Sequence, residues 1–152
     1  MLVSGCGYAF VAGRGLASVS GGRPVRVGAF QNDSSDADAA VSLARATGRA
    51  LAARGLAGPG GLSLSGEVEA VASFPVAVSA PVQNQNVQLW RATVRVRFVL
   101  SDAAGARVLA RATVAESEDY RPGADIEATE AARKLALARA FERCAEDGLD
   151  RL

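Results

Sequence analysis

The hydrophobic pattern of the chain is dominated by four stretches in which apolar and polar residues alternate. A period of two residues is typical of a β-strand that buries one face and exposes the other. The clearest example covers residues 87–100, where every second side chain is apolar and most of the others are arginine or threonine. The four predicted strands cover residues 24–30, 62–74, 87–100 and 107–117.

The same alternation predicts which strand residues face the core. In the strand over residues 87–100, one set of side chains is apolar and the opposite set carries Arg91, Thr93, Arg95 and Arg97. The residues expected on the buried face are Val25, Val27 and Ala29; Leu62, Leu64, Val68, Ala70, Ala72 and Phe74; Trp90, Ala92, Val94, Val96, Phe98 and Leu100; and Val108, Ala110, Ala112 and Val114.

Two other segments have apolar residues at steps of three and four, the period of an amphipathic helix. Ser35 and Asp38 have capping-box spacing, with Asp in place of Glu or Gln, and predict a helix that ends near Arg54 before a glycine-rich stretch. Asp125 is the expected N-cap of a long final helix. The predicted buried stripes are Ala39, Ala40, Leu43, Ala46, Ala50 and Leu51 in the first helix, and Ala128, Ala131, Leu135, Ala138, Phe141, Ala145, Leu149 and Leu152 in the second.

The element order β-α-β-β-β-α defines the expected fold class. Only one side of the predicted sheet is apolar, so both helices are expected to cover that side. This arrangement is an α+β, two-layer sandwich with a four-stranded mixed sheet and two helices on one face. Residues 23–152 are expected to form this single domain, because a chain of 152 residues is long enough for one hydrophobic core.

Composition and charge argue against several classes of function. Seventeen basic and 16 acidic residues give a net charge of +1, which provides no reason to expect nucleic acid as a partner. The chain contains no His, the commonest general base and metal ligand. No nucleophile is paired with a base in the sequence, and no apolar run approaches the roughly 18–20 residues that span a bilayer. We therefore expect neither an enzyme nor a metal or other cofactor.

The N-terminus carries the sharpest chemical signal. Residues 2–6, Leu-Val-Ser-Gly-Cys, resemble a lipobox, where a bacterial signal peptidase cuts before a diacylated cysteine. Small residues at Ser4 and Gly5 fit the narrow peptidase cleft, and the Cys6 thiol would accept the lipid. We expect residues 1–5 to be the remnant of a lipoprotein signal peptide, and residues 6–22 to be the lipidated cysteine with a flexible, glycine-rich tether. In the alternative interpretation, Cys6 is an ordinary thiol.

Residues 6–10, Cys-Gly-Tyr-Ala-Phe, resemble the mature N-terminus of the LPS-assembly lipoprotein LptE family, which reads Cys-Gly-Tyr-x-Phe or Cys-Gly-Tyr-x-Leu. The order of the predicted elements resembles that family over nearly the whole mature chain. The resemblance implies a palmitate-carrying lipoprotein on the periplasmic face of the outer membrane. Gly7, rather than Asp, after the cysteine agrees with sorting to that membrane.

The resemblance also implies a function and partners. A protein of this family assists lipopolysaccharide (LPS) assembly and LPS transport to the cell surface, as part of cell envelope biogenesis. Its expected partner is an LptD-like β-barrel translocon protein, for which it acts as a plug, and LPS is a candidate ligand. The alternative function is a lipid-anchored periplasmic regulator of a cell-wall synthase, which would need a tether long enough to reach inward.

Arginine dominates the polar side of the predicted sheet, where alternation also places Arg26, Glu67 and Glu69. A guanidinium group binds phosphate through two parallel hydrogen bonds, and lipid A carries phosphates. The alternative is a solvated face of cross-strand ion pairs, each worth at most about 1 kcal/mol. No family motif places these residues, so the assignment depends on strand geometry alone. The candidate LPS- or partner-binding residues are Arg91, Arg95, Arg97, Arg107 and Arg111.

Three other features are weaker candidates. The loop predicted over residues 75–86 is apolar for an exposed connection, which indicates either a partner surface or a simple hairpin loop. Asp33, Asp36 and Asp38 lack the glycine and distal glutamate of a calcium loop and are explained by a nearby helix N-terminus. Cys144 lies at a helical position beside Phe141 and is expected to be a small buried hydrophobic residue.

Overall fold

The computed structural model describes residues 15–78 and 88–152 of the chain. Within these residues, the elements follow the predicted order, with one short additional helix at the start. The elements are α1 (Gly15–Ser20), β1 (Val25–Asn32), α2 (Ala39–Ala53), β2 (Leu62–Val78), β3 (Gln88–Asp102), β4 (Val108–Tyr120) and α3 (Ile126–Arg151).

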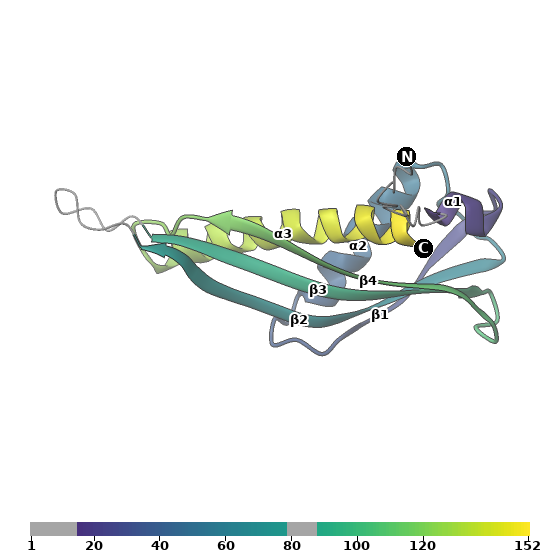
Figure 1. Cartoon of the computed structure of the whole chain (residues 1–152), viewed down its shortest axis with the longest axis horizontal. Helices are drawn as coiled ribbons and strands as arrows, with labels where there is room; N and C mark the ends of the chain where they lie inside the picture. The colour runs from purple at the N-terminus through teal and green to yellow at the C-terminus, as the bar shows by residue number, and fades with distance from the viewer. Residues whose placement is uncertain (1–14, 79–87) are drawn as a thin grey trace, which may run out of the picture.

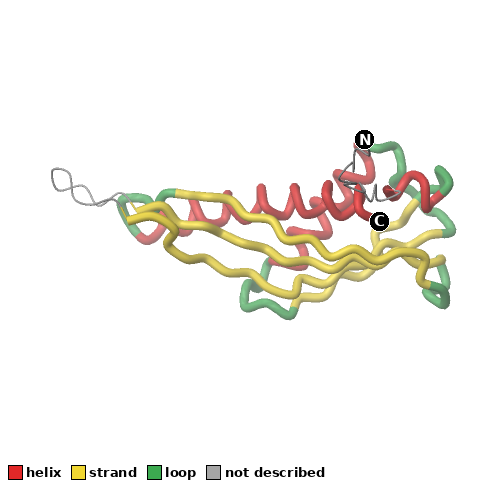
Figure 2. The backbone as a smooth tube through the Cα atoms, viewed as in Figure 1, coloured by secondary structure: helices red, strands yellow, loops and turns green. Residues whose placement is uncertain are grey.

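The four strands form one open sheet in the order β1-β2-β3-β4. β1 runs parallel to β2, and the other two neighbouring pairs are antiparallel. The parallel pair is connected through α2, and the antiparallel strands follow one another directly along the chain. Helices α2 and α3 lie on the same side of the sheet, and the opposite side is uncovered (Figures 1 and 2). The predicted fold class, an α+β two-layer sandwich with a four-stranded mixed sheet, is confirmed.

Phe98 of β3 lies at the centre of the core and is fully buried. Its ring meets Phe30 of β1 edge to face, with 6.4 Å between the ring centroids. Two glycines make this packing possible: a Cβ on Gly66 would overlap the ring of Phe30, and a Cβ on Gly148 of α3 would overlap the ring of Phe98. The aromatic pair therefore fills space that β2 and α3 leave by having no side chain at these points.

A β-bulge in β2 reverses part of the predicted alternation. The pairing with β3 is regular up to Val68, and it shifts between Val68 and Ala70 because Glu69 is an extra residue in the strand. Beyond it, Val71 is partly buried against the core, whereas Phe74 is 44% exposed on the uncovered side. The prediction that Ala70, Ala72 and Phe74 face the core was therefore wrong, since one inserted residue moves all later side chains to the opposite face.

Irregular pairing also explains two errors at the strand ends. The register between β1 and β2 shifts between Val27 and Phe30, so Ala29 is exposed and Phe30 packs against the core. The register between β3 and β4 shifts after Leu100, and Val108 is consequently 43% exposed. Both residues were predicted to be buried, because continuous alternation assumes a regular ladder.

The buried stripe of α3 is only partly the predicted one. Phe141, Ala145, Leu149 and Leu152 are buried as expected. The first half of the predicted stripe faces solvent instead, and Leu135 is 55% exposed. The core contacts of α3 are made by a neighbouring set of mostly small residues, which lets the helix lie close to the sheet. This set contains Ala136, Leu137, Ala140 and Cys144.

The two long helices begin differently. The Asp125 carboxylate accepts a hydrogen bond from the backbone N–H of Ala128 at 2.7 Å, which confirms the predicted N-cap of α3. α2 begins only at Ala39, and the Asp38 side chain makes no capping hydrogen bond. The capping box predicted from Ser35 and Asp38 was therefore wrong. Residues 32–36 form a hydrogen-bonded turn through side chains instead, and this turn delays the helix.

The stretch predicted as a flexible tether contains folded structure. Gly15–Ser20 form α1, in which Leu16 and Ser20 are buried. α1 lies beside the C-terminal end of α3 (Figure 1). Burial of Leu16 against this end gives the segment a packing energy that its glycine content does not indicate. Residues 6–14 of the predicted tether, including Cys6, lie outside the described residues.

Candidate functional site

The uncovered side of the sheet is the face on which the sequence placed the arginines. In β3, Ala92, Val94, Val96 and Phe98 are buried, and Arg95 and Arg97 between them are exposed. Arg26 of β1 follows buried Val25, and Arg111 of β4 precedes buried Ala112, so both belong to the same face. Arg107 is exposed but lies just before β4 rather than in it; because the register shift after Leu100 pairs Val108 with Ser101, alternation does not put Arg107 on this face, and it lies at the end of the sheet beside it. We call this surface the open face.

One half of the open face is a network of ion pairs. The Arg91 guanidinium donates two hydrogen bonds to the Asp119 carboxylate of β4, at 2.6 and 2.9 Å. Arg97 donates to Glu69 of β2, and its Nη1 also lies 3.5 Å from a Glu67 oxygen. Arg95 shares the same Glu69 carboxylate at 2.9 Å. Each of the three β3 arginines is thus matched by an acidic residue on a neighbouring strand.

These contacts change the acidity of the carboxyl groups. A hydrogen bond from Arg97 lowers the pKa of Glu69, and one from Arg91 lowers the pKa of Asp119. The pKa of Glu67 is raised instead, mainly because its carboxyl is hydrogen-bonded to that of Asp33 at the end of β1. Glu69 and Asp119 are therefore ionised at neutral pH and offset much of the positive charge of the arginines that they contact.

The other half of the open face carries positive charge without a matching acid. Within the described residues, Arg26 and Arg111 on this face, and Arg107 at the end of the sheet beside it, form no ion pair. We call this region the arginine end. Arg26 pairs across the sheet with Ser63, and Ser63 with Ser101 of β3, so the strands between the arginines contribute hydroxyl groups.

The chemistry of the arginine end suits a phosphorylated ligand. Three guanidinium groups supply bidentate donors, and the serines supply further hydrogen bonds to sugar or phosphate oxygens. Four neighbouring strands are about 14 Å wide at the usual strand spacing, so groups on β1 and β4 bracket an area comparable to a lipid headgroup. Next to it, a shallow pocket of about 290 Å³ on the same face is lined by residues that include Ser65, Val99 and Arg97.

Sequence reasoning found the arginines and two of their three acidic partners. Glu67 and Glu69 were recognised, whereas Asp119 was not, because the last strand was predicted to end at residue 117. The strand continues to Tyr120, and alternation extended by two residues would have placed Asp119 on the open face. Asp33 follows β1 in the chain, and only the register of β1 against β2 shows that it lies beside Glu67.

The remaining candidates are located as follows. The segment predicted as a loop over 75–86 is strand up to Val78, and residues 79–87 lie outside the described part of the chain. Asp36 forms an ion pair with Arg133 of α3, and the described residues contain no cluster of three or more metal-ligand side chains. Cys144 is a free, buried thiol, and burial raises its pKa to about 12, so it behaves as the predicted hydrophobic residue.

The fold is shared with solved bacterial proteins of low sequence identity. PelC from Paraburkholderia phytofirmans, solved as a dodecamer, is 20% identical with a TM-score of 0.53, over 85% of this chain and 87% of that one. A Caulobacter crescentus protein described as a lipoprotein is 17% identical with a TM-score of 0.57, over 88% and 91%. XCC0632 from Xanthomonas campestris is 15% identical with a TM-score of 0.51, over 84% of each chain. A search among curated proteins finds no match to the chain.

These similarities define the class of fold, a two-layer α+β sandwich. The family assignment comes from the sequence: residues 23–152 match the family described as LptE, lipopolysaccharide-assembly. The chain therefore belongs to the LptE family, as its N-terminal motif and element order suggested. None of the described helices is both long and apolar enough to cross a membrane.

Proposed function

We propose that this protein is a non-catalytic outer-membrane lipoprotein that contacts the phosphates of LPS through the arginine end of its open face. The observation that carries this proposal is the uneven charge of that face. Arg91, Arg95 and Arg97 are matched by carboxylates, whereas Arg26, Arg107 and Arg111 have none among residues 15–78 and 88–152. The five arginines predicted from sequence thus reduce to Arg107 and Arg111, with Arg26 added.

The test is binding of LPS to a triple variant, Arg26→Ala, Arg107→Ala and Arg111→Ala. Each charge-assisted contact contributes about 1.5–3 kcal/mol, although the three terms need not add, so binding should weaken by at least tenfold. All three residues are exposed, and the melting temperature should therefore change little. A matched control removes three exposed basic residues from the helical side, at positions Arg45, Lys134 and Arg139.

The comparison uses LPS and dephosphorylated LPS at two salt concentrations. The wild type should prefer phosphorylated LPS, and added salt should weaken that preference, because screening acts on exposed charges. The control variant should bind as the wild type does. Equal binding by wild type and the Arg26, Arg107 and Arg111 variant would refute the role of the arginine end. Equal losses in both triple variants would mean that net charge alone attracts LPS.

We further propose that Cys6 carries the lipid anchor and that the partner is an LptD-like β-barrel protein of the outer membrane. Support comes from the lipobox at residues 2–6 and from membership of the LptE family. Expressed behind a complete lipoprotein signal peptide, a Cys6→Ser variant should lose incorporation of a palmitate analogue and be released to the periplasm. Label retained on the variant would contradict the anchor. Co-purification of a large β-barrel protein from native membranes tests the partner.

A further inference from the structure

Half of β2 is an edge strand, although β2 lies inside the strand order. The last pair between β1 and β2 is Asn32 with Val68, and β2 continues to Val78. Past Val68, the side of β2 that faces away from β3 has no neighbouring strand within the described residues. In Figure 1 this part of β2 forms the rim of the sheet, at the end opposite to α1.

The five residues of this rim that follow the bulged Glu69, Ala70–Phe74, are suited to accept another strand. They pair with β3 in unbroken register, from Ala70 with Arg95 to Phe74 with Arg91. In a regular strand, alternate residues point their N–H and C=O groups to the same side, so part of this backbone is directed to the open rim. We call residues 70–74 the free β2 edge.

The free β2 edge is bounded by two protecting features, the bulge at Glu69 and Pro75, but its five residues carry none of their own. Exposed edges are usually protected by charged residues or proline. The segment reads Ala-Val-Ala-Ser-Phe, with neither. β4, the outer strand on the other side of the sheet, is different: it carries Arg111, Glu116, Glu118 and Asp119. Of these two edges, the one without a charged residue or proline over five consecutive residues is therefore Ala70–Phe74 of β2.

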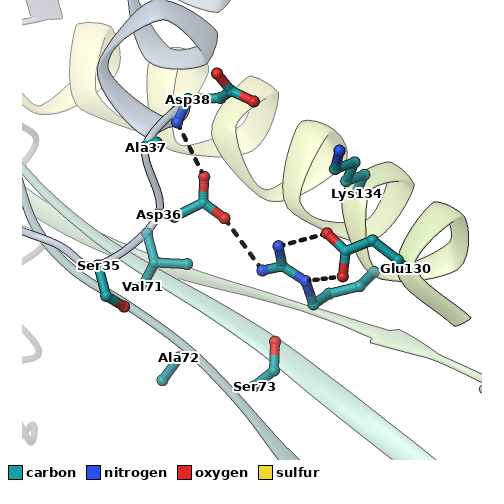
Figure 3. Close-up of a pocket in the computed structure, with 10 residues that line it drawn as sticks. Ser35, Asp36, Ala37, Asp38, Val71, Ala72, Ser73, Glu130 and Lys134 are labelled. Carbon is teal, nitrogen blue, oxygen red and sulfur yellow. Dashed lines mark hydrogen bonds and ion pairs between the residues drawn. The ribbon is translucent and has the colours of Figure 1, made fainter. Parts of the chain in front are cut away.

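A cleft of about 420 Å³ runs along the free β2 edge on its helical side. It is bounded by Val71–Ser73, by the loop of residues 35–38 and by α3 (Figure 3). Arg133 of α3 is held there by Asp36 at 3.1 Å and by Glu130 at 2.8 Å. The ion pair between Arg133 and Asp36 connects the loop to α3, so the loop and the helix together close the cleft on the side away from β2.

The two sides of the edge offer different surroundings to an added strand. In the cleft, the side chains of Asp38 and Lys134 and the buried Ser73 hydroxyl have no hydrogen-bond partner among the described residues. On the open face, Ala70 and Ala72 are exposed beside Phe74. Side chains of an added strand would therefore be polar toward the cleft and apolar toward Phe74.

We propose that the free β2 edge is a docking site for an extended segment of a partner protein, which adds to the sheet as a strand in line with β1. Its backbone bonds to the outward amides and carbonyls of residues 70–74, and its side chains alternate between polar and apolar. An added strand has to fit between β2, the loop of residues 35–38 and α3, which together line the cleft, and this favours a single segment over the sheet of a second copy. This docking does not depend on LPS.

The experiment uses the full chain, labelled with ¹⁵N, and a synthetic probe peptide of eight alternating threonines and valines with a lysine at each end. The peptide should slow hydrogen exchange of alternate amides in residues 70–74 at least about fivefold at saturation. The control peptide has all interior amides N-methylated, which removes the donors of both its edges, and it should give no protection.

Two protein variants, Val71→Pro and Ala72→Pro, complete the test. One of these neighbours directs its N–H to the rim, and proline at that position should keep the β3 pairing and abolish peptide binding. If neither variant folds, the exchange measurement on the wild type still decides the question. Protection on β4 instead of β2, equal binding of the N-methylated peptide, or no binding at millimolar peptide would overturn the proposal. A dimer of the protein alone that the peptide dissociates would also overturn it, since a second copy would then occupy the edge.

Discussion

Two alanine substitutions, one at Phe98 of β3 and one at Phe74 of β2 beyond the bulge, test whether the structure or simple alternation describes the core correctly. Phe98 and Phe74 were both predicted to be buried, but Phe98 is fully buried and Phe74 is 44% exposed. Phe98→Ala removes a ring packed against Phe30 and between strand and helix backbone, and a buried Phe→Ala change costs about 3–5 kcal/mol. Phe74→Ala removes a ring with roughly half the burial, so its cost should be about 1 kcal/mol.

Urea and thermal unfolding of the two variants and the wild type measure this difference. A domain of this size loses roughly 2–4 °C in melting temperature per kcal/mol, so Phe98→Ala should lower Tm by roughly 6–20 °C and Phe74→Ala by no more than about 4 °C. Both changes remove the same side chain, so unfolded-state effects largely cancel. Equal losses would mean that Phe74 is in the core and that the register shift at Glu69 is wrong. A small loss of stability for Phe98→Ala would mean that Phe98 is not in the core. The opposite face of β3 would then be buried, and the arginines would not lie on an open face.

Two other outcomes follow from specific contacts. Gly148→Ala should destabilise the protein by about 1–3 kcal/mol, although alanine favours helix, because the new methyl overlaps Phe98; Phe98→Leu should partly rescue it in a double-mutant cycle. In an NMR pH titration, Glu69 should titrate below 4.5, because Arg97 stabilises its charged form, and Glu67 above 4.5. The ion pairs of Glu69 therefore stabilise the fold above pH 4.5, and this stabilisation is lost as the pH falls through the lowered pKa of Glu69. A pKa of Glu69 above that of Glu67 would contradict the ion-pair network of the open face.

The sequence was sufficient to predict burial where the apolar repeat is unbroken and the whole element packs against one surface. In β3 the alternation is unbroken, and the buried set from Ala92 to Leu100 was predicted correctly. The stripe of α2 was predicted for the same reason: Leu43, Ala46 and Leu51 are all buried under a sheet of constant geometry. The element order and the position of both helices on one side followed from these patterns.

The sequence was insufficient to predict the direction of a side chain where contacts with another strand or helix, rather than neighbouring residues in the chain, determine it. A bulge is a relation between two strands, so Glu69 cannot be recognised as an extra residue from the composition of β2 alone. The rotation of α3 also depends on its packing: both Leu135 and Leu137 have helical spacing to apolar neighbours, and only contact with the sheet buries Leu137. Which arginines are neutralised depends on the register of β3 against β2 and β4, and no single-strand pattern contains that register.

The docking of α1 determines how a membrane-anchored copy would be oriented. Since Gly15–Ser20 are folded beside the C-terminal end of α3, only residues 7–14 separate a lipid on Cys6 from the domain. Eight extended residues span at most about 29 Å, roughly half the reach of a tether running to residue 22. α3 itself is 26 residues, or about 39 Å, long, and the free β2 edge lies toward its other end. Under the proposed acylation, the arginine end would stay close to the lipid headgroups while the free β2 edge is held in the periplasm, where only a soluble or protruding polypeptide could meet it.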